Sequence, residues 1–194
     1  MTDTRAQILR LNYESIHRFG FQGTRTDKVI ADLDITKGAF YHYFANKQEL
    51  GYAVIDEILA PTYSSLWRQL DQYDHYPLDG IIEILNDIKD KVEEQDVKLG
   101  SPLTNLINEM AGLDEGFQTR LASILDEMRE TLVRTLRRAS DQFQLASLVN
   151  PEKTALFIIA SVEGSFGVGK AYQSKAAFDQ SIDQLIRYIR SIKR

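Results

Sequence analysis

The sequence predicts an all-α protein of nine helices. Apolar residues recur every three or four positions through most of the 194 residues, and no stretch alternates between apolar and polar residues as a strand does. Ser101-Pro102 and Asn150-Pro151 each combine a helix-capping side chain with a proline, which suits the first turn of a helix. Hydrophobic residues make up 43% of the chain, so a sizeable core is expected rather than global disorder.

The predicted helices follow one another with short connections. The first four cover residues 3–19, 25–32, 37–43 and 47–70, and the remaining five cover 79–95, 101–113, 114–144, 151–174 and the segment that carries apolar residues from Phe178 to Ile192. The apolar pattern of the seventh helix includes Phe143, and Lys98-Leu99-Gly100 is predicted to be a loop. Pro61 lies inside the fourth helix and removes the hydrogen bond to the Glu57 carbonyl, so we expect a kink or a break there.

Capping signals mark the starts of the short helices. Thr24 with Asp27 three residues later resembles a capping box, as does Asn46 with Glu49. Thr36 is the expected cap of the third helix.

Two residues mark the ends of the first two helices. Gly20 is a natural residue to end the first helix. Leu33-Asp34-Ile35 is the predicted turn between the second and third helices, because aspartate tolerates the left-handed conformation better than most residues.

Residues 25–44 therefore form two short helices joined by a tight turn, the arrangement of a helix-turn-helix whose second helix enters the major groove of DNA. Lys37 can reach a phosphate or a guanine edge, Gly38 lets the backbone approach DNA closely, and the Ala39 methyl can pack on a thymine methyl. The other candidate DNA-binding residues carry hydroxyls, cations or an imidazole at the helix starts and on the third helix: Thr24, Arg25, Thr26, Thr36, Tyr41, His42, Tyr43 and Lys47. A phosphate neighbour would explain why a lysine stands at position 47, in the first turn of a helix.

Each of these signals is weak when it is taken alone. Phe40 and Phe44 are expected in the core of the head, and a lysine such as Lys37, taken by itself, is more often a solvated surface lysine than a DNA contact. The net charge of −5 does not favour DNA, although residues 1–47 hold seven Lys/Arg and five Asp/Glu and therefore carry +2. The ordered set of residues from Thr24 to Lys47, rather than the charge, points to nucleic acid.

Several other classes of protein are disfavoured. Cysteine is absent, and His17, His42 and His75 lie far apart without paired carboxylates, so we expect neither a metal site nor a cofactor. Gly164, Gly167 and Gly169 lie in a helical pattern rather than after a strand, so they do not form a phosphate loop. With no nucleophile and base paired, an enzyme is not expected. No apolar run approaches the ~20 residues of a membrane helix and no signal peptide is evident, so a cytoplasmic protein is expected.

Three motifs resemble the signature of TetR-type transcriptional regulators: G-F-Q-G-T-R-T at 20–26, T-K-G-A-F-Y-H-Y-F at 36–44 and N-K-Q-E-L at 46–50. The resemblance is strong over residues 5–59 and looser beyond. It implies a nine-helix subunit with a helix-turn-helix domain over residues 1–48 and a helical ligand-binding and dimerisation domain over residues 49–194. It also implies a homodimer that binds a palindromic double-stranded DNA operator, usually represses, and is released by a small-molecule effector.

The resemblance also assigns roles to single positions. In the family, the positions matching Lys37, Gly38, Ala39 and Tyr41 face bases, and those matching Thr24, Thr26, Tyr43 and Lys47 face phosphates. Two residues depart from the family pattern. Asp34 stands where glycine is common, and Ile30 stands where a small alanine is usual. The alternative to a regulator is a helical ligand-binding or structural protein that carries the head without using it.

The C-terminal helices carry two further predictions. A glycine inside a helix costs about 1 kcal/mol relative to alanine, and the close approach of another helix compensates for this. The eighth and ninth helices are therefore the predicted dimer interface, and the residues expected to be buried there or in the adjoining core are Ile158, Val162, Phe166, Ile182, Leu185 and Ile189.

A ligand pocket is expected among helices four to eight. Its candidate lining residues are Tyr63, Trp67, Ile88, Leu103, Asn105, Leu106, Glu109, Met110 and Phe166. For the apolar members, plain core burial is the alternative. Asn105 and Glu109 lie four residues apart on an otherwise apolar helix face, so they must find polar partners or be exposed at a surface or an interface.

Overall fold

The computed structural model describes residues 3–194, and it confirms the all-α fold. Within that range no strand is formed, and the β-type pairing is an isolated antiparallel bridge between Leu145 and Lys193. The chain divides into two compact units. Unit 1 contains Met1–Thr62 and Pro102–Ser123, and unit 2 contains Tyr63–Ser101 and Ile124–Arg194.

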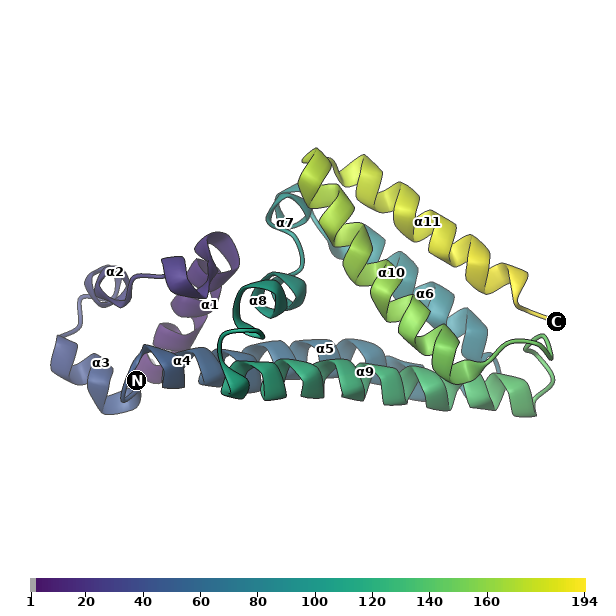
Figure 1. Cartoon of the computed structure of the whole chain (residues 1–194), viewed down its shortest axis with the longest axis horizontal. Helices are drawn as coiled ribbons and strands as arrows, with labels where there is room; N and C mark the ends of the chain where they lie inside the picture. The colour runs from purple at the N-terminus through teal and green to yellow at the C-terminus, as the bar shows by residue number, and fades with distance from the viewer. Residues whose placement is uncertain (1–2) are drawn as a thin grey trace. The chain divides into compact units, whose positions relative to one another are not determined.

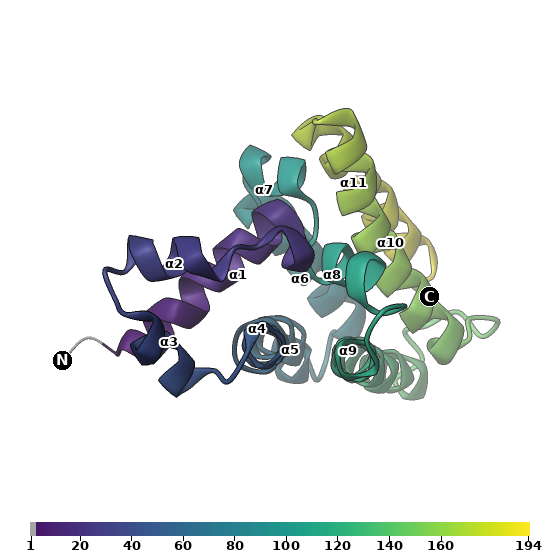
Figure 2. The ribbon, with the colours of Figure 1, turned by 60° about the vertical axis from the view of Figure 1, so that its left-hand side comes forward.

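Unit 1 is built around the first helix, α1 (Thr4–Gly23). This helix packs against α4 (Lys47–Val54) and α8 (Pro102–Met110), as Figure 2 shows. The short helices α2 (Thr26–Asp32) and α3 (Lys37–Tyr43) complete the head. The unit also contains the π-helical turn η1 (Ile55–Leu59), and it shares α5 (Ala60–Arg68) and α9 (Glu115–Asp141) with unit 2.

Unit 2 is dominated by α10 (Pro151–Tyr172) and α11 (Lys175–Ser191), which lie side by side (Figure 1). The helix α11 also packs against α6 (Pro77–Lys91), and the short helix α7 (Glu94–Leu99) packs against both α10 and α11. A 3-10 turn, η2 (Gln69–Gln72), follows α5 and packs against α6.

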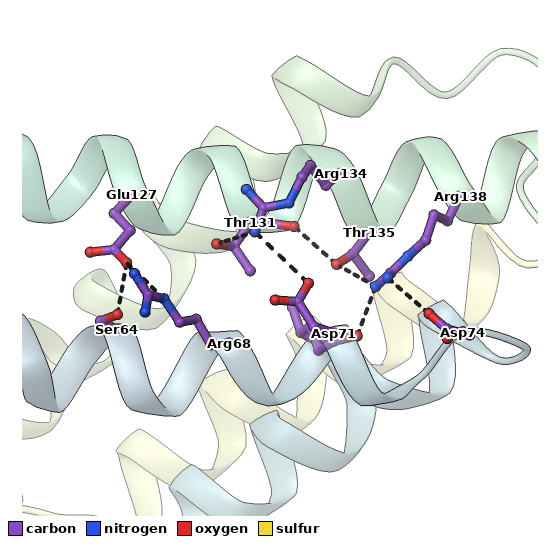
Figure 3. Close-up of polar contacts among 10 residues, drawn as sticks. Ser64, Arg68, Asp71, Asp74, Glu127, Thr131, Arg134, Thr135 and Arg138 are labelled. Carbon is purple, nitrogen blue, oxygen red and sulfur yellow. Dashed lines mark hydrogen bonds and ion pairs between the residues drawn. The ribbon is translucent and has the colours of Figure 1, made fainter.

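A row of arginines joins the unit 2 part of α9 to the end of α5 and to η2 (Figure 3). Arg68 Nη2 lies 2.7 Å from Glu127 Oε1, and the Ser64 hydroxyl donates to the same oxygen at 2.7 Å. Further along, Arg138 Nη2 donates to the Leu70 carbonyl at 2.7 Å. This arginine therefore binds a backbone carbonyl within the 3-10 turn, and the row as a whole connects α9 to α5 and η2.

The nine predicted helices all have counterparts among the described residues. The predicted fourth helix is α4, η1 and α5 in succession. The predicted fifth helix is wrong beyond residue 91, because α6 ends at Lys91 and a capping box formed by Glu93 and Asp96 starts α7. Leu99 is therefore the last residue of a helix rather than part of a loop, and Gly100 follows it with φ +81°.

The short helices of the head begin and end close to the predicted positions. The Thr36 hydroxyl accepts the Ala39 N–H at 3.1 Å, and Asn46 Oδ1 accepts the Glu49 N–H at 2.8 Å, so both predicted caps are confirmed. Asp34 adopts the left-handed conformation expected of the turn, with φ +51°.

The predicted capping box at Thr24 is wrong. The second helix begins at Thr26, after Arg25, and no side chain caps it. The Thr24 hydroxyl instead donates to the Gly20 carbonyl at 2.8 Å. Gly20 interrupts the first helix with φ +79°, but one more helical turn follows as far as Gly23. Thr24 therefore closes the preceding helical turn instead of capping the next helix.

Two further differences from the predicted helices concern Pro61 and Phe143. No kink or break falls at Pro61 itself. The irregularity precedes it, because the Ala60 N–H donates to the Ile55 carbonyl across the π-helical turn, and such a wide turn gives the proline ring room. Phe143 is not part of the apolar face of the seventh helix. It lies after α9 with φ +57° and is 75% exposed, as the left-handed residue that ends the helix.

No helix within residues 3–194 is long and apolar enough to cross a membrane.

Candidate nucleic-acid interface

The helix α3 is fixed in the head by one face and exposes the other. Phe40 is fully buried and packs edge-on against Tyr41, with ring centroids 5.3 Å apart. Phe44, directly after the helix, is also buried. Because residues 40 and 44 anchor one side, the side chains of the other side face outwards: Tyr41 is 50% exposed and Tyr43 is 39% exposed.

The remaining predicted DNA-binding residues differ in exposure. Five are exposed, namely Arg25, Thr36, Lys37, Gly38 and His42, while Thr26, Ala39 and Lys47 are partly buried. Thr24 is buried, and its hydroxyl proton is committed to the Gly20 carbonyl. Its oxygen can still accept a hydrogen bond, but it has no proton to donate to a phosphate while that bond lasts.

Lys37 is paired within the head. Its Nζ lies 3.0 Å from Asp27 Oδ1, and both side chains are largely exposed. The hydrogen bond to Asp27, followed by the charge of the same carboxylate, raises the pKa of Lys37. Sequence reasoning placed Asp27 in a capping box and missed this partner.

Lys47, the first residue of α4, has partners within unit 1. Its Nζ donates to the Gln22 carbonyl at 3.1 Å and lies 4.9 Å from the centroid of the Phe21 ring. Partial burial lowers the pKa of Lys47, and the charge of Glu109 opposes that effect. These contacts account for a lysine in the first turn of a helix when no DNA is bound. The phosphate contact that the sequence predicts for Lys47 stays a prediction.

Glu109 has a role that the sequence did not predict. Its Oε2 accepts the Phe21 N–H at 2.7 Å, and its Oε1 accepts the Gln22 N–H at 2.8 Å. The sequence did signal that Glu109 needed polar partners, because it lies on an apolar helix face. It could not signal that the partners were two backbone groups at the entrance to the helix-turn-helix.

A second carboxylate, that of Asp114, joins the start of α9 to α4. Its Oδ1 accepts the Tyr52 hydroxyl at 2.7 Å and the Phe117 N–H at 2.9 Å, and its Oδ2 accepts from the Gln48 side chain. The hydrogen bond from the Phe117 N–H, followed by that from Tyr52, lowers the pKa of Asp114.

The predicted ligand-binding residues are divided between the units. Unit 1 contains Leu103, Asn105, Leu106, Glu109 and Met110, and unit 2 contains Tyr63, Trp67, Ile88 and Phe166. The apolar members other than Phe166 are buried, while the Tyr63 hydroxyl lies 3.1 Å from Ser101 Oγ. The ligand-binding set remains a prediction.

The predicted dimer residues lie mainly inside the subunit. Ile158, Val162, Ile182, Leu185 and Ile189 are buried in the single chain, and the partly buried Phe166 packs against Phe178 at 4.6 Å between ring centroids. The exposed large apolar residues of α10 are different ones: Leu156, Phe157, Val168 and Tyr172.

Comparisons with known proteins identify the family. Residues 8–54 match the family model of "Bacterial regulatory proteins, tetR family", and residues 77–185, more than half of the chain, match "Tetracyclin repressor-like, C-terminal domain". The first match spans α2, α3 and the whole of α4.

Curated relatives and solved structures agree with this match. An uncharacterised helix-turn-helix regulator encoded in the lacX 3′ region of Lactococcus lactis subsp. lactis is 26% identical over 185 residues, covering 95% of this chain and 92% of that protein. The transcriptional repressor DhaR of Mycobacterium sp. is 20% identical over 179 residues, covering 92% and 88%. The crystal structure of Escherichia coli NemR in its reduced form has a TM-score of 0.86 at 19% identity, covering 99% and 97%, and therefore has the same fold.

The helix-turn-helix head with its exposed α3 and the two family models lead to one conclusion. The chain belongs to the TetR family of DNA-binding transcriptional regulators.

Proposed function

We propose that this regulator is a dimeric repressor that binds a palindromic operator through α3 and is released by a small-molecule effector. The observation that carries the proposal is the arrangement of α3, which buries Phe40 and exposes Lys37, Tyr41 and Tyr43. A helix held in this way can enter a major groove without unfolding the head. The repressor assignment is supported by the name of the mycobacterial relative.

The DNA contacts follow from this arrangement. Lys37, Gly38, Ala39 and Tyr41 read base edges, and Tyr43, Lys47 and the residues at the start of α2 contact phosphates. The side chains of Lys37 and Lys47 must leave their partners in the head to do so, because Lys37 pairs with Asp27 and Lys47 donates to the Gln22 carbonyl. Binding of DNA therefore exchanges intramolecular contacts for phosphate or base contacts.

The dimer interface is proposed to lie on the exposed side of α10. Gly164 and Gly167 are exposed within this helix, and a Cβ atom added at either position would meet nothing within 4 Å in the subunit. Packing inside the subunit therefore does not compensate for their cost of about 1 kcal/mol each. Leu156, Phe157 and Val168 are exposed on the same helix, and a second copy of α10 would cover them.

The effector is proposed to bind in the C-terminal part of the chain, over which the family's C-terminal domain matches. Binding would favour an arrangement in which the two α3 helices no longer match half-sites about 34–36 Å apart. A typical coupling free energy is about 1–3 kcal/mol. The chain contains no cysteine, so the effector response does not use a thiol.

The first experiment measures DNA binding. Fragments from the DNA flanking the gene are titrated with the protein, and binding is compared with that of Lys37→Ala and Tyr41→Ala. Both variants are expected to weaken binding to the preferred fragment by at least tenfold, and Lys153→Ala, an exposed lysine of α10, serves as the matched charge control. Specific binding that neither head variant changes would refute the site assignment. Absence of specific binding to any DNA would favour a helical protein that does not use its head.

The second experiment concerns the relay of the effector signal. Pro61 follows the π-helical turn in the helix that connects the head to the C-terminal helices, and we propose that this irregular turn takes part in release. Pro61→Ala restores a backbone donor and should reduce effector-induced dissociation from DNA. Release identical to that of the wild-type protein would exclude a role for this proline.

A further inference from the structure

The Glu109 carboxylate binds the turn through which the chain leaves α1 and enters the helix-turn-helix. One oxygen accepts the Phe21 N–H and the other accepts the Gln22 N–H, at 2.7 and 2.8 Å. Bonds from N–H groups to an ionised carboxylate are charge-assisted and directional. Gly20 permits this approach, because a Cβ atom there would lie 2.8 Å from Glu109 Oε2 and because its φ is +79°.

The same turn also holds the ammonium group of Lys47. Gln22 is bound at both its backbone groups, since its N–H donates to Glu109 and its carbonyl accepts from Lys47 Nζ at 3.1 Å. The Phe21 ring lies under the ammonium at 4.9 Å and is buried. A continuous series of contacts therefore runs from α8 through Phe21 and Gln22 to the first residue of α4, entirely within unit 1.

We propose that Glu109 is a positioning residue for DNA binding that acts through Lys47. By fixing the Phe21–Gln22 turn, its carboxylate holds the ammonium of Lys47 where it can pass from the Gln22 carbonyl to a DNA phosphate. This inference rests on the proposed phosphate contact of Lys47. Since Glu109 belongs to the segment that matches the family's C-terminal domain, it gives that domain a direct connection to a DNA-contacting side chain.

The test removes the carboxylate without changing its size. Glu109→Gln leaves one acceptor oxygen for two N–H groups and turns an amide N–H₂ towards one of them, so the turn loses a hydrogen bond. DNA affinity is measured as a function of salt for the wild type, Glu109→Gln, Lys47→Gln and the double variant. Each protein is assayed well below its own thermal midpoint, and its helix content is checked by circular dichroism.

The effects of Glu109→Gln and Lys47→Gln on DNA affinity should not be additive. Lys47→Gln should lower the magnitude of the salt slope by about 1.8 for the bound dimer, because each of its two subunits loses one phosphate contact worth about 0.9. Glu109→Gln should weaken binding at least threefold and reduce the slope in the same direction. In the Lys47→Gln background, however, Glu109→Gln should change the affinity less than twofold, because the group through which it acts is already missing.

Two control variants separate this effect from general destabilisation. Asp114→Asn weakens the hydrogen bonds from Tyr52 and Gln48 in the same unit but does not touch Gln22 or Lys47. Glu115→Gln removes an equal charge from an exposed position of unit 1. Both should have the same effect on DNA affinity whether or not Lys47 is present.

Several outcomes would overturn the proposal. Equal losses of affinity from Glu109→Gln in both backgrounds, or a lower thermal midpoint with unchanged affinity and slope, would make Glu109 a structural residue only. If Lys47→Gln had no effect while Lys37→Ala weakened binding, the relay through Lys47 would be wrong and the proposed function would stand. Should Glu109→Gln not fold, Glu109→Asp takes its place, because it keeps the charge but shortens the side chain. Its DNA affinity is then measured with and without Lys47→Gln and compared by the same criteria.

Discussion

Lys37, the first residue of α3, the helix that is proposed to read DNA, is paired with Asp27 of α2 across 3.0 Å. The pair is exposed, and such pairs contribute about 0–1 kcal/mol to stability. It nevertheless places a carboxylate beside a lysine that is proposed to contact DNA. Any DNA contact of Lys37 must compete with Asp27, and the aspartate is itself repelled by phosphates.

We therefore expect Asp27→Asn to increase DNA affinity about two- to tenfold. Lys37→Ala should cost more in the Asp27→Asn background than in the wild type, because the lysine then has no partner to leave. Fluorescence anisotropy titrations of the four proteins measure this coupling. Asp32→Asn, at an exposed aspartate of the same helix, is the control for charge. Equal costs of Lys37→Ala in the two backgrounds would contradict the competition.

Asp114 should make stability depend on acid pH. Its pKa is lowered in the folded protein, first by the Phe117 N–H and then by Tyr52. The carboxylate therefore stabilises the fold above its unfolded-state pKa, and this stabilisation disappears as the pH falls through the folded-state pKa. The free energy of unfolding, measured with urea, should decline more steeply between about pH 5 and pH 2 in the wild type than in Asp114→Asn. Parallel curves would show that Asp114 contributes nothing to the acid dependence.

Gly164 tests the proposed dimer face. A Cβ atom added at this position meets nothing within 4 Å in the subunit, so Gly164→Arg should leave helix content unchanged but shift the protein to a monomer. Sedimentation equilibrium measures the change. The control is Gly112→Arg, the same substitution at another glycine whose added Cβ has open space, in the turn between α8 and α9. A Gly164→Arg protein that remains as dimeric as Gly112→Arg would place the interface elsewhere.

Gly51 tests the aromatic packing that supports the head. An added Cβ would lie 2.6 Å from Phe117 Cζ and 2.6 Å from Phe21 Cε2, and neither ring can yield easily. Gly51→Ala should therefore lower the free energy of unfolding by about 1–3 kcal/mol, in spite of the better helix propensity of alanine. Gly23→Ala is the matched helical control, because its Cβ would make an ordinary contact of 3.5 Å with Phe19. Equal stability of the two variants, measured by urea unfolding, would contradict the packing.

The helices were predictable where their signals are local. Thr36 and Asn46 each cap a helix through a backbone N–H three residues later, and Asn150 does the same for Lys153 in α10. Such bonds depend on neighbouring residues only. Thr24 shows the limit of this reasoning, because its hydroxyl had two backbone choices and bonded backwards to Gly20. The start of α7 was missed because its cap uses glutamate rather than the usual short side chains.

The partners of the charged side chains were not predictable in the same way. Sequence reasoning identified Lys47 and Glu109 as residues whose positions needed an explanation, but it did not identify their partners within the chain. The phosphate contact of Lys47 and the pocket role of Glu109 stay predictions. Their partners are backbone groups of Phe21 and Gln22, which are 25 to 88 residues away in the chain. No periodicity or spacing encodes contacts at such separations.

By itself, the sequence determined the all-α fold, the helix-turn-helix with Lys37 and Tyr41 on its second helix, and the family. Helix periodicity, caps and short motifs each depend on residues that are close together in the chain. Only the tertiary structure decided that Asp27 holds Lys37 and that Glu109 holds the turn beside Lys47. The physical reason is that a charge selects its partner by distance in space, and that distance is set when the helices pack.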